Sequence, residues 1–192
     1  KKIMSRMHDL INEDSGRQAR AVEVTPELTW FKDAGWFVSD YTMKVGHHTI
    51  KADKIFIVSG ARAGIPPIKG IKDVSYLTSD TVLGLEAQPK TMVIIGGGYI
   101  AAEYGHFFSS MGTEVTIVQR NPRFLPGEEP EISELLKEEM KKRMAIFTNH
   151  EAVEVTEKDG VKTLRARSRV DGSFKEFSAE ALLIAAGRVP NS

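Results

Sequence analysis

The sequence contains no cysteine among its 192 residues. A disulfide framework and a thiolate metal site are therefore both excluded. The sequence also has no excess of charge of either sign, because 26 Lys and Arg residues balance 26 Asp and Glu residues. A chain with balanced charge has no global field that would attract nucleic acid or an anionic membrane, so we expect neither as a partner.

Long hydrophobic runs are absent as well. The longest run, residues 92–102, is interrupted by three glycines and closed by Glu103, so it cannot span a bilayer. No signal peptide is recognisable, and together these absences predict a cytoplasmic protein. The five histidines have no partners at metal-ligand spacing, and no Ser-His-Asp order or paired-carboxylate site is present. We therefore expect no metal site.

The most informative stretch of the chain is a strand-turn-helix-strand pattern over residues 91–120. Its apolar run at 92–95 predicts a strand that stops at three consecutive glycines. Apolar residues then recur at three- and four-residue spacing, which predicts a helix that ends at Gly112. A second apolar run at 115–118 predicts the next strand.

The turn between the first strand and the helix reads Gly96-x-Gly98-x-x-Ala101. In such a turn the first glycine permits the tight bend, and the second lets the backbone approach a pyrophosphate. The small Ala101 lets the helix lie close to the strand, and the free N–H groups at the helix N-terminus favour an anion. The pattern predicts a dinucleotide site, and the alternative is a glycine-rich turn in another α/β fold.

The end of the second strand bears on which dinucleotide binds. In an NAD site an acidic residue at this position accepts hydrogen bonds from the ribose 2′-hydroxyl. This sequence has Gln119 and Arg120 there, with Arg123 three residues further on. Because a guanidinium can pair with a 2′-phosphate, the pattern favours NADP(H) over NAD(H). Alternatively, both arginines are solvated loop residues and Gln119 tolerates either cofactor.

Three stretches of the chain resemble the pyridine nucleotide–disulfide oxidoreductases, a family of flavoproteins with two dinucleotide-binding domains. The family includes glutathione reductase, dihydrolipoamide dehydrogenase, mycothione reductase and mercuric reductase. Residues 96–103 resemble its NAD(P)-binding motif, residues 54–61 its Ala-Thr-Gly turn beside FAD, and residues 182–191 its Gly-Arg-x-Pro-Asn segment. The resemblance implies FAD and NADP or NAD as cofactors, and hydride transfer from NAD(P)H through FAD to a disulfide or thiol-type acceptor.

The resemblance also implies roles for single residues. Tyr99 matches an aromatic residue that shields the flavin, and Glu103 matches a carboxylate that pairs with a lysine near the nicotinamide. Gly187 matches a backbone approach to NAD(P)H, and Arg188 matches an interdomain contact. Alternatively, Tyr99 is a packing residue, Glu103 interacts with the helix dipole and Arg188 forms a surface ion pair.

We also assign several other positions to cofactor binding, most of them glycines or other small residues. The resemblance implies that the backbone near Gly35 approaches the adenine of FAD, although a plain turn glycine is an equal alternative. The full cofactor-binding set is Gly96, Gly97, Gly98, Tyr99, Ile100, Ala101, Glu103, Gln119, Arg120, Ala152, Gly187, Arg188, Ser59, Gly60 and Gly35.

The chain departs from the family in what it lacks. The redox-active Cys-x₄-Cys pair, the FAD glycine motif, the later acidic segment and the dimerisation domain are missing. We therefore expect an internal fragment without a complete catalytic cycle, from an intact protein that the resemblance implies is a homodimer. Three alternatives stay open: an NAD-dependent dihydrolipoamide dehydrogenase acting on a lipoyl substrate, a flavin reductase without a disulfide, and a nucleotide-sensing module without turnover.

The expected domains are an incomplete FAD-domain segment at residues 1–88 and a Rossmann-like α/β NAD(P)-binding domain at residues 89–192. In the first we expect a helix that ends at Ser15-Gly16 and then exposed loop to Arg20. An antiparallel meander over 21–52 and a buried strand over 55–58 should follow.

Pro66 and Pro67 exclude helix from residues 64–70, which we expect to form a surface excursion, and a short helix should begin at Ser79 or Asp80.

In the second domain we expect an amphipathic helix over 131–144 that faces inward with Ile132, Leu135, Leu136, Met140 and Met144. A strand should follow at 145–148. Two Asp-Gly turns, at 159–160 and 171–172, predict a three-stranded meander in place of a crossover helix. A further parallel strand is expected at 181–185.

Overall fold

The computed structural model describes residues 2–191 and divides the chain into two compact units, Lys1–Ser59 and Gly60–Ser192. The expected division into an FAD-domain segment and an NAD(P)-binding domain at residue 88 stays a prediction, and the compact units divide at residue 59 instead. The reason is that Ile68, Ile71 and Val82 are buried in the core of the second unit.

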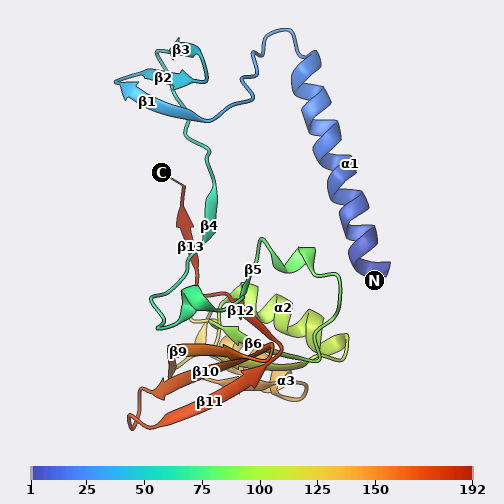
Figure 1. The fold of residues 1–192 in the computed structure, drawn as a ribbon, viewed down its shortest axis with the longest axis vertical. Coiled ribbons are helices and arrows are strands. Elements are labelled where there is room, and N and C mark those ends of the chain that lie inside the picture. Colours follow the sequence, from blue (N-terminus) through green and yellow to red (C-terminus); the bar gives the residue numbers. More distant parts are fainter. Residues whose placement is uncertain (1, 192) are drawn as a thin grey trace. The chain divides into compact units, whose positions relative to one another are not determined.

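The first unit consists of a long helix and a small antiparallel sheet (Figure 1). The sheet order is β1-β2-β3. Its elements are α1 (Lys2–Val24), β1 (Gly35–Ser39), β2 (Thr42–Val45) and β3 (His48–Lys51). The expected meander is therefore confirmed for residues 35–51, whereas residues 21–24 belong to the helix.

Helix α1 does not stop at Ser15-Gly16, so that prediction and the loop expected up to Arg20 were wrong. Gly16 costs a helix interior only about 1 kcal/mol relative to alanine. Arg17 forms ion pairs with Glu13 and Asp14 across this point. The helix ends just before Thr25-Pro26, where proline disfavours the helical conformation of the residue that precedes it. Within residues 2–191, no helix combines the length and the apolar character needed to cross a membrane.

The buried strand expected over residues 55–58 does not form. The exposed fractions of Phe56 and Val58 are 84% and 91%. An apolar run becomes a buried strand only where a neighbouring strand pairs with it and a core covers it. Among the described residues, nothing pairs with this segment as a strand.

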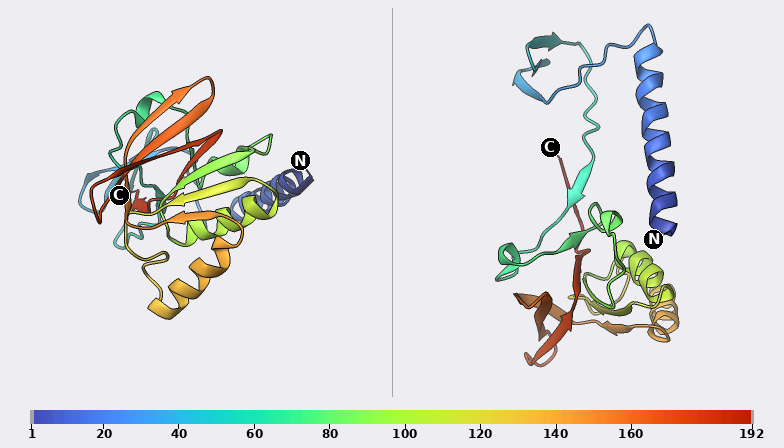
Figure 2. Two further views of the ribbon diagram at one scale, coloured as in Figure 1. Left: turned by 90° about the horizontal axis from the view of Figure 1, so that it is seen from below. Right: turned by 45° about the vertical axis from the view of Figure 1, so that its right-hand side comes forward.

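The second unit is built on a five-stranded parallel sheet of order β5-β12-β6-β7-β8, with two helices (Figures 1 and 2). Its elements are β5 (Leu77–Thr78), β6 (Thr91–Ile95), α2 (Tyr99–Ser110), β7 (Glu114–Val118), α3 (Pro130–Lys141), β8 (Ala145–Phe147) and β12 (Ala181–Ile184). The Rossmann-like α/β architecture is therefore confirmed.

A three-stranded antiparallel meander covers one face of this sheet. Its strands are β9 (His150–Lys158), β10 (Val161–Ser168) and β11 (Phe174–Ala179). Side chains alternate along β6, so Ile94 joins a core with the helices and Val93 joins a core with the meander. The predicted Asp159-Gly160 turn is confirmed, with φ of 51° and 79° at its two central residues.

The second predicted turn carries a perturbed carboxyl group. Hydrogen bonds with Ser168 and Ser173 lower the pKa of Asp171 from 3.8 to about 2. Because the folded-state pKa is depressed, this contact stabilises the folded protein at pH values above 3.8, the ordinary pKa of the group. The stabilisation is lost as the pH falls through about 2 and the carboxylate becomes protonated. We expect an NMR titration to give a carboxyl pKa near 2 for Asp171, and Ser173→Ala to raise it. A titration centred near 3.8 in the folded protein would contradict the turn geometry.

Three helix predictions need correction. Helix α3 ends at Lys141, although Met140 and Met144 are buried as expected. Ile132 and Leu135 are 52% and 62% exposed, so they do not face inward. The short helix after Ser79 is reduced to a 3₁₀ turn, η2 (Val82–Gly84). The excursion at residues 64–70 is not helical, as predicted, but it buries Ile68.

Two short strands that the sequence did not predict form a separate antiparallel ribbon that extends away from the parallel sheet (Figure 1). They are β4 (Ala61–Ala63) and β13 (Arg188–Pro190). Strands of three residues carry no measurable periodicity, and their pairing depends on contacts between distant parts of the chain.

Candidate dinucleotide-binding site

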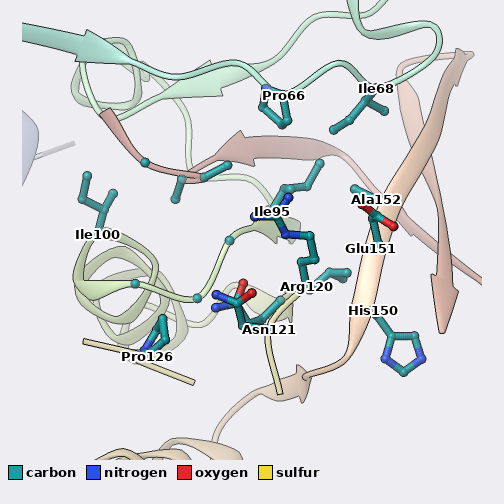
Figure 3. A pocket seen from close by; sticks show the side chains of 18 of the residues that line it. Pro66, Ile68, Ile95, Ile100, Arg120, Asn121, Pro126, His150, Glu151 and Ala152 are labelled. Carbon is teal, nitrogen blue, oxygen red and sulfur yellow. The ribbon is translucent and has the colours of Figure 1, made fainter. Parts of the chain in front are cut away.

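A pocket of about 430 Å³ lies at the carboxyl ends of β6, β7 and β12. Ligands of open α/β sheets bind at this edge. Figure 3 shows residues 150–152 on β9 across the pocket from Ile100 and Pro126. The lining residues are Pro66, Pro67, Ile68, Ile95, Gly96, Gly97, Gly98, Tyr99, Ile100, Val118, Gln119, Arg120, Asn121, Pro126, His150, Glu151, Ala152, Ala185, Ala186, Gly187 and Arg188.

Different structural features account for glycine at each of the three consecutive positions 96–98. Gly96 has φ of 116°, and a Cβ there would overlap the carbonyl oxygen of Ala185. A Cβ on Gly97 would lie 2.8 Å from Cγ of Gln119. A Cβ on Gly98 would meet no atom within 4 Å, although Gly98 lines the pocket. Close packing therefore accounts for the first two glycines, whereas the position of a Cβ on the third is open space at the pocket.

The N-terminus of α2 opens onto this space. Its N-cap is Gly98, which has no side chain that could accept hydrogen bonds from the first N–H groups of the helix. The first helical hydrogen bond runs from Ala102 N–H to Gly98 O, at 3.1 Å. The N–H groups of the first turn have no intrahelical acceptors, and Tyr99 and Ile100 line the pocket. The pocket can therefore hold a pyrophosphate at the positive end of the helix.

The structure separates the roles of Gln119 and the two arginines. Gln119 is only 6% exposed, and its Nε2 lies 3.5 Å from the carbonyl oxygen of Arg123. Its side chain packs under Gly97, so it supports the glycine turn. Arg120 is exposed and lines the pocket, whereas Arg123 does not line it. Arg120 is therefore the cation that can contact a phosphate on this side of the pocket.

Strand β9 contributes three consecutive residues to the pocket, His150, Glu151 and Ala152. A β-bulge shifts the register between β9 and β10 next to Ala152, and bulges re-aim side chains near binding sites. The N–H of His150 donates to Gln119 O at 3.0 Å, which joins the start of β9 to the end of β7. Of these three residues, only Ala152 was expected at the site from the sequence. Glu151 carries no local motif that could have identified it.

The segment Pro66–Ile68, which we call the proline wall, closes the pocket next to β9. Lys69 holds this wall in place. Its N–H donates to Val153 O at 3.1 Å, and its Nζ lies 2.6 Å from Oε1 of Glu154. The hydrogen bond and the charge of Lys69 lower the pKa of Glu154. A Cβ on Gly70, whose φ is 81°, would overlap the carbonyl oxygen of Val155.

The two residues proposed to act near the nicotinamide are placed differently. Tyr99 is 61% exposed and lines the pocket. Glu103 lies one turn further along α2, is exposed, and does not line the pocket. It makes no ion pair within residues 2–191. Burial raises the pKa of neighbouring Tyr104, with smaller contributions from the charges of Glu103 and Asp80.

Arg188 lines the pocket and also joins three segments. Its Nη1 donates to Oγ of Ser79 at 3.0 Å and lies 3.4 Å from Oδ1 of Asp80. Its Nη2 donates to the carbonyl oxygen of Ala61 on β4. Gly187, which also lines the pocket, accepts a hydrogen bond from Gly64 N–H at 2.9 Å. These contacts hold β13, β4 and the loop before η2 together.

We expect Arg188→Gln to loosen this ribbon. A glutamine side chain cannot reach Ser79, Asp80 and Ala61 together, so amide hydrogen exchange should speed up in β4 and β13. Hydrogen exchange measured by mass spectrometry tests this. Arg123→Gln, which removes an exposed arginine outside the pocket, is the matched control. Equal exchange in both variants would show that Arg188 does not hold the ribbon.

The three residues proposed for FAD do not line this pocket. A Cβ on Gly35 would lie 3.1 Å from Cε of Met43 and from Cγ2 of Val45, so packing on β2 accounts for this glycine. Gly60 has φ of 71° and open space around its α-carbon, and its carbonyl oxygen accepts a hydrogen bond from Asn191 N–H at 3.0 Å. The roles of Gly35, Ser59 and Gly60 toward FAD stay predictions. Within residues 2–191, no group of three or more acidic, His or Cys side chains could hold a metal ion.

Comparisons with known proteins agree with this geometry. Residues 5–192 match the family model described as pyridine nucleotide-disulphide oxidoreductase. Mercuric reductases from Staphylococcus aureus and Bacillus cereus are 35% and 36% identical over 92% and 98% of this chain. The Cu(II) complex of the HOCl-induced flavoprotein disulfide reductase RclA from Escherichia coli matches 98% of the chain with a TM-score of 0.86 and 26% identity.

The chain spans only part of each of these proteins. It covers 32% and 30% of the two mercuric reductases and 43% of the RclA chain. The family match nevertheless extends over almost the whole sequence and includes the glycine turn, the pocket and β13. The chain therefore belongs to the pyridine nucleotide-disulphide oxidoreductase family.

Proposed function

We propose that the chain is the nucleotide-binding part of an FAD-dependent oxidoreductase that takes hydride from NADPH or NADH. The observation that carries this proposal is the pocket at the strand ends, where Gly98, the N-terminus of α2 and Arg120 converge. The pocket fits a dinucleotide because its open glycine position and free helical N–H groups suit a pyrophosphate.

Several pocket residues then have defined tasks. Gly98 and the first turn of α2 bind the pyrophosphate, and Arg120 pairs with a 2′-phosphate on the adenosine ribose. Tyr99, exposed at the pocket, is an aromatic cover that can move aside when the nicotinamide enters. Gly187, which has no side chain, lets the nicotinamide half of the nucleotide approach the backbone. The protein binds and orients the cofactors, and the cofactors carry the redox chemistry.

FAD, when bound in the intact protein, would supply the redox chemistry that connects NAD(P)H to the acceptor. By resemblance to the family's Ala-Thr-Gly turn, Ser59 and Gly60 are the residues of this chain that would lie beside it. Glu103 would pair with a cation near the nicotinamide. The electron acceptor would be a small-molecule disulfide or related thiol compound, and the intact protein would be a cytoplasmic homodimer.

Two other functions fit particular observations. An NAD-dependent dihydrolipoamide dehydrogenase, acting on a lipoyl substrate, would leave Arg120 as a solvated loop residue, which agrees with the exposure of its side chain. A nucleotide-sensing module would use the same pocket without turnover. A full-length protein with a flavin spectrum favours the enzyme, and a colourless one that binds nucleotide favours the sensor.

A titration of the chain with NADPH and with NADH, followed by nucleotide fluorescence, tests the proposal. We expect NADPH to bind more tightly, and Arg120→Ala to weaken NADPH by about 10-fold because a charged hydrogen bond contributes roughly 1.5–3 kcal/mol. The affinity for NADH should change little in this variant. The control is Arg123→Ala, which removes the same charge outside the pocket. No binding of either nucleotide by the folded chain would overturn the site, and equal losses in both variants would overturn the role of Arg120.

A further inference from the structure

Among the described residues, Glu151 is the one carboxylate that lines the pocket, and the proposed roles of the glycine turn and Arg120 leave it without a task. Its side chain is 33% exposed. Its Oε2 accepts a hydrogen bond from Nη2 of Arg167 at 3.1 Å. Its Oε1 makes no hydrogen bond or ion pair within residues 2–191. A half-buried carboxylate with one free oxygen in a pocket is an acceptor for a ligand donor.

The order of the strands tells which part of a dinucleotide lies beside Glu151. The glycine turn follows β6, which lies between β12 and β7 in the sheet. The pocket therefore extends in two directions from the pyrophosphate, toward residues 185–188 after β12 and toward Arg120 after β7. The residue at the end of β7 contacts the adenosine ribose in this fold. The adenosine half thus lies on the β7 side.

The β7 side of the pocket continues onto β9. His150 N–H donates to Gln119 O, so the first residues of β9 directly adjoin the end of β7. Ala152 packs on the apolar cluster that contains Ile68, and both residues line the pocket. This apolar surface suits the face of a purine ring, and Glu151 lies next to it in the chain. Because side chains alternate along a strand, the side chain of Glu151 lies on the face of β9 opposite Ala152, beside Arg167. A purine that lies on the apolar surface and extends past the edge strand β9 would bring its polar edge to the carboxylate.

We infer that Glu151 recognises the adenine base by accepting a hydrogen bond from its 6-amino group through Oε1. This inference rests on the proposed function, because it requires a dinucleotide in the pocket. The ion pair with Arg167 orients the carboxylate and leaves Oε1 available. Adenine offers a donor at this position, whereas hypoxanthine offers a carbonyl oxygen, which a carboxylate repels. Glu151 is thus a specificity-determining residue for the base.

The test compares NADPH with its reduced hypoxanthine analogue, in which the 6-amino group is replaced by oxygen. Both nucleotides are titrated into the full 192-residue chain and followed by nucleotide fluorescence. We expect NADPH to bind about 10-fold more tightly than the analogue, as for loss of one hydrogen bond to a charged group. In Glu151→Gln the ratio should fall to near 1, because an amide can accept from adenine or donate to hypoxanthine.

Two variants serve as controls. Glu176→Gln makes the same change on β11, at an exposed carboxylate outside the pocket, and should keep the wild-type ratio. Arg167→Gln removes the partner but keeps the carboxylate, and should keep a preference for NADPH. A wild-type ratio near 1, or a ratio that survives in Glu151→Gln, would overturn the inference while leaving the nucleotide site intact. No binding of either nucleotide would overturn both the inference and the proposed function.

Discussion

Gly98→Ala is expected to weaken nucleotide binding by about 100-fold, equivalent to about 2.7 kcal/mol, while leaving the fold intact. Gly98 lines the pocket at the N-terminus of α2, and a Cβ there would meet no protein atom within 4 Å. The added methyl group would therefore enter the space that a pyrophosphate needs, without a clash in the free protein. Fluorescence titration with NADPH measures the loss.

The same variant provides its own control for stability. The backbone of Gly98 has φ of −89° and ψ of −170°, which an alanine adopts without strain. Replacing glycine by alanine at such a position stabilises a protein by about 0.4–1 kcal/mol, because the unfolded chain loses freedom. The melting temperature should therefore stay constant or rise slightly. Wild-type affinity for NADPH in a folded Gly98→Ala protein would contradict the pyrophosphate assignment.

Gly96→Ala is expected to act in the opposite way and to destabilise the second unit by about 4 kcal/mol, the sum of two effects. The positive φ of Gly96, 116°, contributes strain of about 1–3 kcal/mol for a residue with a side chain. Overlap of the new Cβ with the carbonyl oxygen of Ala185, just after the neighbouring strand, adds about 1–3 kcal/mol more. The nucleotide site should be lost because the sheet edge that forms it no longer packs.

The measurement is urea unfolding followed by circular dichroism. Both tryptophans, Trp30 and Trp36, lie in the first unit, so tryptophan fluorescence does not report on the second. Gly127→Ala is the matched control, since no atom lies within 4 Å of a Cβ there and its φ is not positive. Unfolding of Gly96→Ala at the wild-type midpoint would show that β6 and β12 do not approach each other as closely as the structure indicates.

The sequence predicted the local elements of the second unit well, because each has its own periodicity or turn chemistry. The strand, glycine turn and helix over residues 91–110 and the meander with its Asp-Gly turn follow from patterns within a few residues. The same reasoning failed for residues 55–58 and for Ile132 and Leu135. Their apolar character predicted burial, but burial depends on what packs against a segment.

The features of the candidate site also differ in whether the sequence alone could reveal them. The glycine spacing and the arginine after β7 could be recognised in the sequence because turn, helix and strand end are contiguous there. The carboxylate of Glu151, the proline wall and the Arg188 contacts could not, because each joins residues far apart in the chain. Hydrogen bonding between β7 and β9 and the bulge in β9 bring them to one edge of the sheet.

The sequence by itself determined that this chain is an α/β protein with a glycine turn built for a dinucleotide, since backbone conformation at glycines and side-chain periodicity are local properties. Only the tertiary structure decided that Arg120 and not Arg123 lines the pocket, that Gln119 is buried under the glycine turn, and that a carboxylate lies within the site. These outcomes depend on which strands become neighbours, because the packing of a whole sheet sets that order.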